Sequence, residues 1–119
     1  MDWKEKEKSV RQVLERRFRV SLEEKNVSLR GTDSSYRFDL VSPDGKIVGE
    51  IKTYTIGKRK MPHAKIAHTS DAALFLLHAK GAKKRLLVLT DPSFYRLYLR
   101  TRQGQMVQHD GVTLELIKR

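Results

Sequence analysis

The chain has 119 residues, with 25 lysines and arginines against 14 aspartates and glutamates, and no cysteine. This length suits one domain with a buried core, residues 1–119, and the lack of cysteine excludes disulfides and thiolate zinc sites. No apolar run approaches the roughly 18 residues of a membrane span, and the first residues lack a signal-peptide pattern, so we expect a soluble cytoplasmic protein without membrane contact. The charge is concentrated in residues 51–119, where 14 basic residues stand against 4 acidic ones, which indicates a polyanionic partner.

The first predicted element is a helix over residues 3–20. Its stripe recurs at spacings of three and four residues and includes Trp3, Val10 and Leu14. Glu7 falls within this stripe, whereas Glu15 points away from it. After the helix we expect a break, a short strand and a polar loop, at residues 21–26, 27–30 and 31–35.

Residues 36–52 show the pattern of a β-hairpin, with strands over 36–41 and 46–52 and a Ser-Pro-Asp-Gly loop between them. Pairing Val41 with Lys46 aligns the alternating apolar residues on one face. These residues are Tyr36, Phe38 and Leu40 on the first strand, and Ile47, Gly49 and Ile51 on the second. The other face then carries Asp39, Glu50 and Lys52, and the two carboxylates are diagonal neighbours roughly 7–8 Å apart.

The charged face of this hairpin allows two interpretations. Antiparallel sheets often expose one face to water, and the charges then only solvate it. Against this, Asp39 and Glu50 are poor strand formers placed in mid-strand. If they are partly buried, two like charges need a compensating cation. The pattern therefore favours a site for a hard metal ion beside the cationic Lys52.

The second half of the chain is predicted to alternate helix and strand. A helix over residues 62–80 ends at Gly81, and a continuous apolar strand over 85–90 is covered on both faces. The buried face of that helix comprises Ile66, Ser70, Ala73, Leu74 and Leu77. Residues 94–102 fit a helix or a strand; we favour a helix ending near Gly104, followed by strands at 106–108 and 112–117. The order indicates an α/β fold with a central mixed sheet flanked by helices.

The spacing of the charged residues carries a family resemblance. Asp39, a ten-residue gap and then Glu50-Ile51-Lys52 resembles the signature of the PD-(D/E)XK nuclease superfamily, although Phe38 stands where the motif has its leading proline. The order of helix, hairpin, helix and strand is similar too, which implies a restriction-endonuclease-like αβββαβ core. Within the superfamily, the short basic archaeal Holliday junction resolvases look most similar, including the continuation to Thr53.

The resemblance implies a magnesium-dependent DNA endonuclease, with selectivity for branched DNA as in the resolvases. Asp39, Glu50 and the carbonyl of Ile51 would hold Mg²⁺, for which Mn²⁺ could substitute, and Lys52 would act on the water or the phosphate. Hydrolysis of the phosphodiester would leave a 5′-phosphate. The resemblance also implies a glutamate from the first helix, and Glu7 is the better candidate than Glu15 because it lies in the apolar stripe.

A DNA interface is predicted beside this site, with duplex or branched DNA as the partner. It comprises Lys58, Arg59 and Lys60, together with Lys65 and Arg30. Symmetric cutting of two strands would require a homodimer. Two alternatives stay open, a non-catalytic nucleic-acid-binding domain on the same fold and a basic subunit of a larger nucleoprotein complex. A pure binding module, however, gains nothing from two carboxylates that face a polyanion.

Overall fold

The computed structural model describes residues 2–57 and 61–119. It confirms the expected α/β architecture, with a five-stranded mixed sheet flanked by helices. In chain order the elements are α1 (Trp3–Phe18), β1 (Glu23–Ser28), β2 (Ser35–Val41), β3 (Ile47–Lys52), α2 (His63–His78), β4 (Lys84–Leu89), α3 (Pro92–Arg100), α4 (Arg102–His109) and β5 (Thr113–Leu116).

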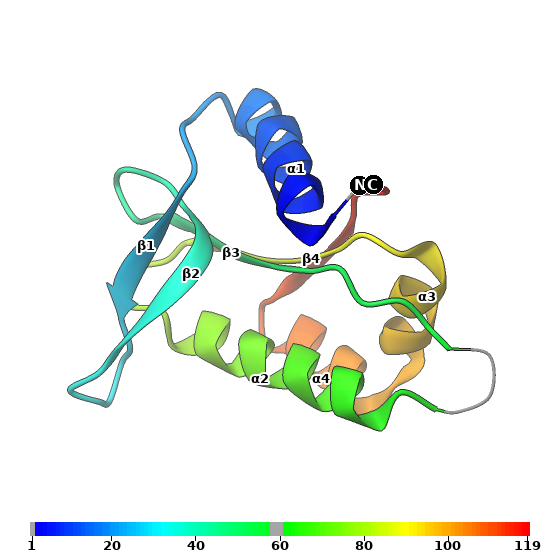
Figure 1. The fold of residues 1–119 in the computed structure, drawn as a ribbon. Coiled ribbons are helices and arrows are strands. Elements are labelled where there is room, and N and C mark those ends of the chain that lie inside the picture. Colours follow the sequence, from blue (N-terminus) through cyan, green and yellow to red (C-terminus); the bar gives the residue numbers. More distant parts are fainter. Residues whose placement is uncertain (1, 58–60) are drawn as a thin grey trace.

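The strands lie in the sheet in chain order, β1-β2-β3-β4-β5. The first three pair antiparallel, whereas β3, β4 and β5 run parallel to one another. Helix α1 lies on one side of the sheet, and α2 and α4 lie on the other (Figure 1). The β1–β2 hairpin bends away from the other strands at the left of this view, so the sheet opens between β2 and β3.

Helix α1 begins where its sequence provides a cap. The Asp2 carboxylate accepts a hydrogen bond from the Glu5 amide at 2.8 Å, and Arg19 ends the helix in a left-handed conformation. Val10 and Leu14 are fully buried, as the stripe predicts. The extension of this buried stripe to Trp3 was wrong, because that side chain is 57% exposed.

Strand β1 begins within the predicted break, at residues 23–26, and includes only residues 27 and 28 of the strand predicted at 27–30. The cause is that nearly all its side chains are exposed, so its sequence shows no apolar alternation. It is a strand because its backbone pairs with β2. Leu29 and Ala79 form a further bridge, which ties the end of this hairpin to the end of α2.

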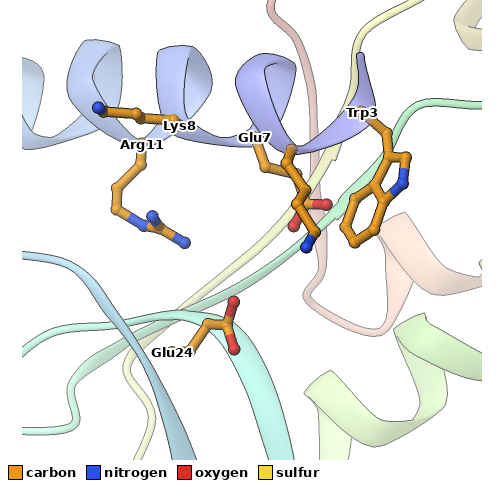
Figure 2. Close-up of a pocket in the computed structure, with 6 residues that line it drawn as sticks. Trp3, Glu7, Lys8, Arg11 and Glu24 are labelled. Atoms are coloured by element: carbon orange, nitrogen blue, oxygen red, sulfur yellow. The ribbon is translucent and has the colours of Figure 1, made fainter.

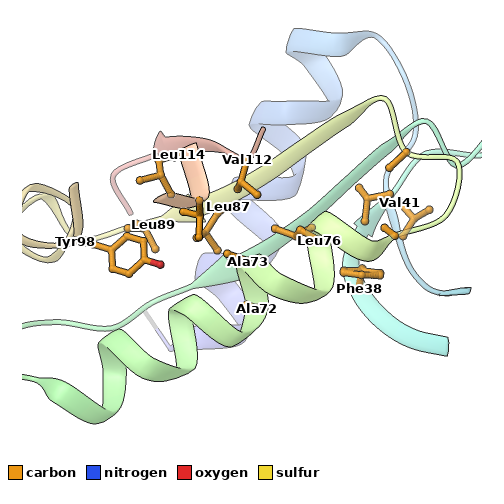
Figure 3. Packing of buried hydrophobic residues seen from close by; sticks show 14 of the residues in the cluster. Phe38, Val41, Ala72, Ala73, Leu76, Leu87, Leu89, Tyr98, Val112 and Leu114 are labelled. Atoms are coloured by element: carbon orange, nitrogen blue, oxygen red, sulfur yellow. The ribbon is translucent and has the colours of Figure 1, made fainter. Parts of the chain in front are cut away.

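Strand β4 begins with the charged Lys84 and Arg85, and from Leu86 to Leu89 it is apolar and covered on both faces, as predicted. Leu86 and Val88 join the core under α1, whereas Leu87 and Leu89 join the core under α2 (Figure 3). The predicted buried face of α2 was only partly right. Leu74 is 53% exposed, and the residues of α2 that are buried are Ile66, Thr69, Ala72, Ala73 and Leu76.

The chain after β4 forms two short helices, so the preference for a helix over residues 94–102 was right and the strand predicted at 106–108 was wrong. Helix α4 begins at the Thr101 cap, whose hydroxyl accepts a hydrogen bond from the Gly104 amide at 2.9 Å. A Cβ at Gly104 would lie 1.9 Å from the carbonyl oxygen of Tyr98. The glycine that was expected to end a helix is therefore the residue that permits the tight corner between α3 and α4.

Candidate active site

The register between β2 and β3 differs by two residues from the predicted one. Val41 pairs with Val48 rather than Lys46, because the Ser42 and Ile47 backbones close the turn with a 3.0 Å hydrogen bond. A two-residue shift keeps each side chain of β3 on its face, whereas a shift of one would not. Its effect is to bring Asp39 level with Glu50 instead of diagonal to it.

A β-bulge in β2 sets the direction of Asp39. Glu23 pairs with Val41 and Lys25 with Phe38, so one residue of β1 faces two residues of β2. The predicted common face of Phe38 and Leu40 was therefore wrong: Phe38 belongs to the core under α2, and Leu40 to the core under α1. Asp39 lies within the bulge, and its Oδ2 accepts a hydrogen bond from the Ile51 amide at 2.8 Å.

Glu50 is the most deeply buried carboxylate of the described chain, at 3% exposure. Its Oε1 has no hydrogen-bond partner within residues 2–57 and 61–119. The pKa of Glu50 is raised to about 9, chiefly by burial and then by the adjacent Asp39, and Lys52 opposes the rise. Without a cation, the protonated form of Glu50 is therefore favoured at neutral pH.

Two tyrosines lie next to these charged residues. Lys52 Nζ lies 5.9 Å from the ring centroid of Tyr54. Tyr36 stacks on Phe75 with centroids 4.4 Å apart, and burial followed by the charges of Glu50 and Asp39 raises the pKa of its phenol to about 12. Tyr36 thus presents a neutral hydroxyl near the two carboxylates. Its position two residues before Phe38 was the available signal, but that pattern also fits an ordinary core residue.

The first helix contributes Glu7 to the same region and not Glu15. The pKa of Glu7 is raised to about 7, chiefly by burial and then by the charge of Asp39, and Lys52 acts in the opposite direction. Glu15 instead accepts a hydrogen bond from the Leu22 amide at 2.9 Å, where it supports the exit from α1. The structure therefore brings together Asp39, Glu50, Lys52 and Glu7.

The donor set matches what a magnesium ion accepts from a protein. No three histidine, aspartate or glutamate side chains converge into a metal cage in the described parts of the chain. Magnesium, however, usually keeps several waters and takes only one or two carboxylates. The Glu50 oxygen that lacks a partner in the described part of the chain lies beside the Asp39 carboxylate and fits that requirement, because a cation would satisfy the oxygen and relieve the like-charge repulsion.

The residues predicted to bind DNA do not all lie near the carboxylates. Lys65, near the start of α2, donates a 2.6 Å hydrogen bond to the Thr55 carbonyl in the loop that leaves β3. Arg30 bonds to the Leu77 carbonyl at the opposite end of α2, so the structure does not bring it to the carboxylates. Lys58, Arg59 and Lys60 lie outside the described residues.

Comparison with protein-family models, with curated proteins and with solved structures finds no match to this chain. In the part of the chain that the structure describes, no helix is both long enough and apolar enough to cross a membrane.

Proposed function

We propose that the chain is a magnesium-dependent endonuclease that hydrolyses phosphodiester bonds in DNA. The observation that carries this proposal is the meeting of Asp39 and Glu50 at the divergence of β2 and β3, where one buried Glu50 oxygen has no hydrogen-bond partner among the described residues. Lys52 follows two residues after Glu50, and Asp39 acts electrostatically on both Glu50 and Glu7.

The residues divide the work of hydrolysis as follows. Asp39, Glu50 and the Ile51 carbonyl would hold the ion, which when bound would polarise a phosphate oxygen and acidify a water. Lys52 would orient the attacking water and neutralise charge that accumulates on the phosphorus oxygens. Tyr36 stays protonated at neutral pH, so its hydroxyl can donate a hydrogen bond without adding charge.

The formal charge of +11 supports a DNA substrate. Two carboxylates repel a phosphodiester unless a cation stands between them and the DNA, whereas basic residues elsewhere attract it. A site of this composition on a basic protein therefore fits an ion that bridges protein and substrate.

A cleavage assay on linear and branched DNA, with and without magnesium, tests the proposal. Asp39→Asn and Glu50→Gln should each lower the cleavage rate by about 10²–10³-fold or more, because each removes a charge that holds the ion. Asp44→Asn is the matched control, since it makes the same change at the turn of the same hairpin and should cleave normally.

Two outcomes would contradict the proposal in different ways. Equal cleavage by all four proteins would identify a contaminating nuclease. Tight DNA binding without cleavage, unaffected by Asp39→Asn or Glu50→Gln, would instead support the non-catalytic binding domain.

A further inference from the structure

A cavity of about 440 Å³ lies between the first turns of α1 and strand β1 (Figure 2). This volume is within the range of pockets that take small organic ligands. It is lined by Trp3, Lys4, Glu7, Lys8 and Arg11 from α1 and by Glu24 from β1. We call it the α1 pocket. It combines an aromatic side chain, three cations and a carboxylate within three turns of one helix.

Trp3 gives the α1 pocket an open aromatic surface. Its ring projects from the start of the helix instead of packing into a core, and the side chain is 57% exposed. The Lys4 ammonium lies 5.6 Å from the ring centroid, so a positive charge stands beside the aromatic face. Aromatic faces of this kind are the surfaces on which nucleic-acid bases stack in single-strand-binding proteins.

The cations of the α1 pocket share one side of the helix. Lys4, Lys8 and Arg11 are spaced by four and then three residues, which places them in a row along the cavity. Arg11 donates a 3.4 Å hydrogen bond to the Asp39 carbonyl, and its buried Nε has no partner in the described chain. Lysine ammonium groups near an aromatic face are suited to a phosphate attached to a stacked base.

The α1 pocket adjoins the carboxylate site. Glu7 lines the pocket and is also close enough to Asp39 and Lys52 for both charges to act on it. The hydrogen bond from Arg11 ends on the backbone of Asp39 itself. Two residues that line the pocket, Glu7 and Arg11, therefore also adjoin Asp39.

We propose that the α1 pocket receives one unstacked nucleotide of the DNA strand whose neighbouring phosphate lies at Asp39 and Glu50. The base would stack on Trp3, Lys4 and Lys8 would hold its phosphate, and Glu7 would accept a hydrogen bond from a base amino group. In a continuous duplex both faces of every base are covered by neighbours, so the pocket selects strands that are locally unstacked. This inference rests on the proposed nuclease function, because it takes the carboxylate site as the place of the scissile phosphate.

Trp3 is the only tryptophan of the chain, so its fluorescence reports on the α1 pocket directly. The wild-type protein is titrated with Ca²⁺ in place of Mg²⁺, because Ca²⁺ also takes oxygen ligands and fills the carboxylate site but supports little hydrolysis. The two DNA ligands are a continuous duplex and the same duplex carrying a short internal gap. We expect strong quenching of tryptophan emission by the gapped DNA and little by the continuous DNA. Equal quenching by both, or none by either, would overturn the inference.

Variants separate stacking from general electrostatic binding. Trp3→Ala should weaken binding of the gapped duplex by about tenfold and leave binding of the continuous duplex unchanged, while Trp3→Phe should retain most of the preference. Met106→Ala is the matched control, because Met106 is 63% exposed on the distant helix α4 and should have no effect. An unchanged preference in Trp3→Ala would exclude Trp3 as the stacking surface.

The two proposals fail separately. A preference for gapped DNA that depends on Trp3, without any cleavage in magnesium, would leave the α1 pocket standing and reject the nuclease. Magnesium-dependent cleavage without that preference would reject the α1 pocket and leave the nuclease standing.

Discussion

The β2–β3 hairpin carries a carboxylate at each end, and the two are in opposite electrostatic states. At the turn, Asp44 accepts hydrogen bonds from the Lys46 amide at 3.0 Å and the Ser42 hydroxyl at 2.7 Å, and these bonds lower its pKa. At the divergent end, burial and the Asp39 charge raise the pKa of Glu50 to about 9. The fold stabilises the ionised form of Asp44, whereas it opposes the ionisation of Glu50.

This contrast separates a carboxylate that stabilises the turn from one that we propose as a metal ligand. Hydrogen bonds that favour the charged form are what a turn requires, because they stabilise the loop. A buried carboxyl with an unpartnered oxygen destabilises the folded ionised protein, and groups of that kind are concentrated at functional sites. Four predictions test whether the contrast is real.

The largest expected effect is on metal affinity. Titration of metal-free protein with Mg²⁺ or Mn²⁺ should show binding that tightens as the pH rises toward about 9, because the ion replaces the proton on Glu50. Glu50→Gln should weaken binding by about 100-fold or more, and Asp44→Asn should leave it unchanged. Calorimetry in buffers of different ionisation enthalpy would detect the released proton, and equal affinities for wild type and Glu50→Gln would exclude Glu50 as a ligand.

The next effect is on stability in the absence of metal. The folded pKa of Glu50, about 9, lies above its ordinary value of 4.5, so its contribution to stability is fully present below pH 4.5 and is lost as the pH rises to about 9. Glu50→Gln does not ionise and should be more stable than wild type at the upper end of this window, by an amount on the order of 2 kcal/mol. Urea unfolding across this range in EDTA measures the difference, which should vanish near pH 4.5.

Glu7 should change the free energy of unfolding with pH in the same direction as Glu50, but over a narrower pH range. Its pKa is raised from 4.5 to about 7, so wild type loses stability between those values and Glu7→Gln should not. The effect should be smaller than for Glu50, because Glu7 is only partly buried and Arg11 and Lys52 oppose the shift. Glu5→Gln, an exposed change on the same helix, is the control for thermal unfolding at both ends of the window.

Asp44 should have the smallest effect on the free energy of unfolding, and this effect should depend on pH in the opposite direction. Its lowered pKa means that its contribution is present above its ordinary value of 3.8 and is lost as the pH falls through the folded pKa. Asp44→Asn should therefore be slightly less stable than wild type at neutral pH and equal to it in strong acid. If Asp44→Asn instead gained stability at neutral pH, the turn carboxylate would not differ in kind from Glu50.

The sequence allowed the main features of this hairpin to be predicted, because they depend on local rules. Alternation placed Asp39, Glu50 and Lys52 on neighbouring strands, and the helical stripe preferred Glu7 over Glu15. The register was wrong by two residues, since the turn is closed by Ser42 and Ile47 rather than by the shortest loop. Burial of the apolar face could not detect this, because a shift of two leaves the faces of β3 unchanged.

Other features depend on contacts that are distant in sequence. The β-bulge at Asp39 appears only when β1 pairs with β2, and β1 itself has no apolar alternation. The role of Tyr36 requires both its stacking on Phe75 of α2 and the nearby charges of Asp39 and Glu50. From the sequence alone, Gly104 indicates the end of a helix. Only the structure shows that the backbone of Tyr98 leaves no room for a side chain at this position.

Strand β4 has a consequence for how the protein opens. It contributes side chains to the cores on both sides of the sheet. We therefore expect that loss of either helical layer also destabilises the other, because both layers pack on this strand. Its amide protons should therefore exchange with solvent only through global unfolding, at the slowest rate in the protein. Strand β3, which carries Glu50, pairs with β4 along its whole length. The buried carboxyl, whose ionisation is unfavourable, is therefore held in place by the strand that we expect to unfold last.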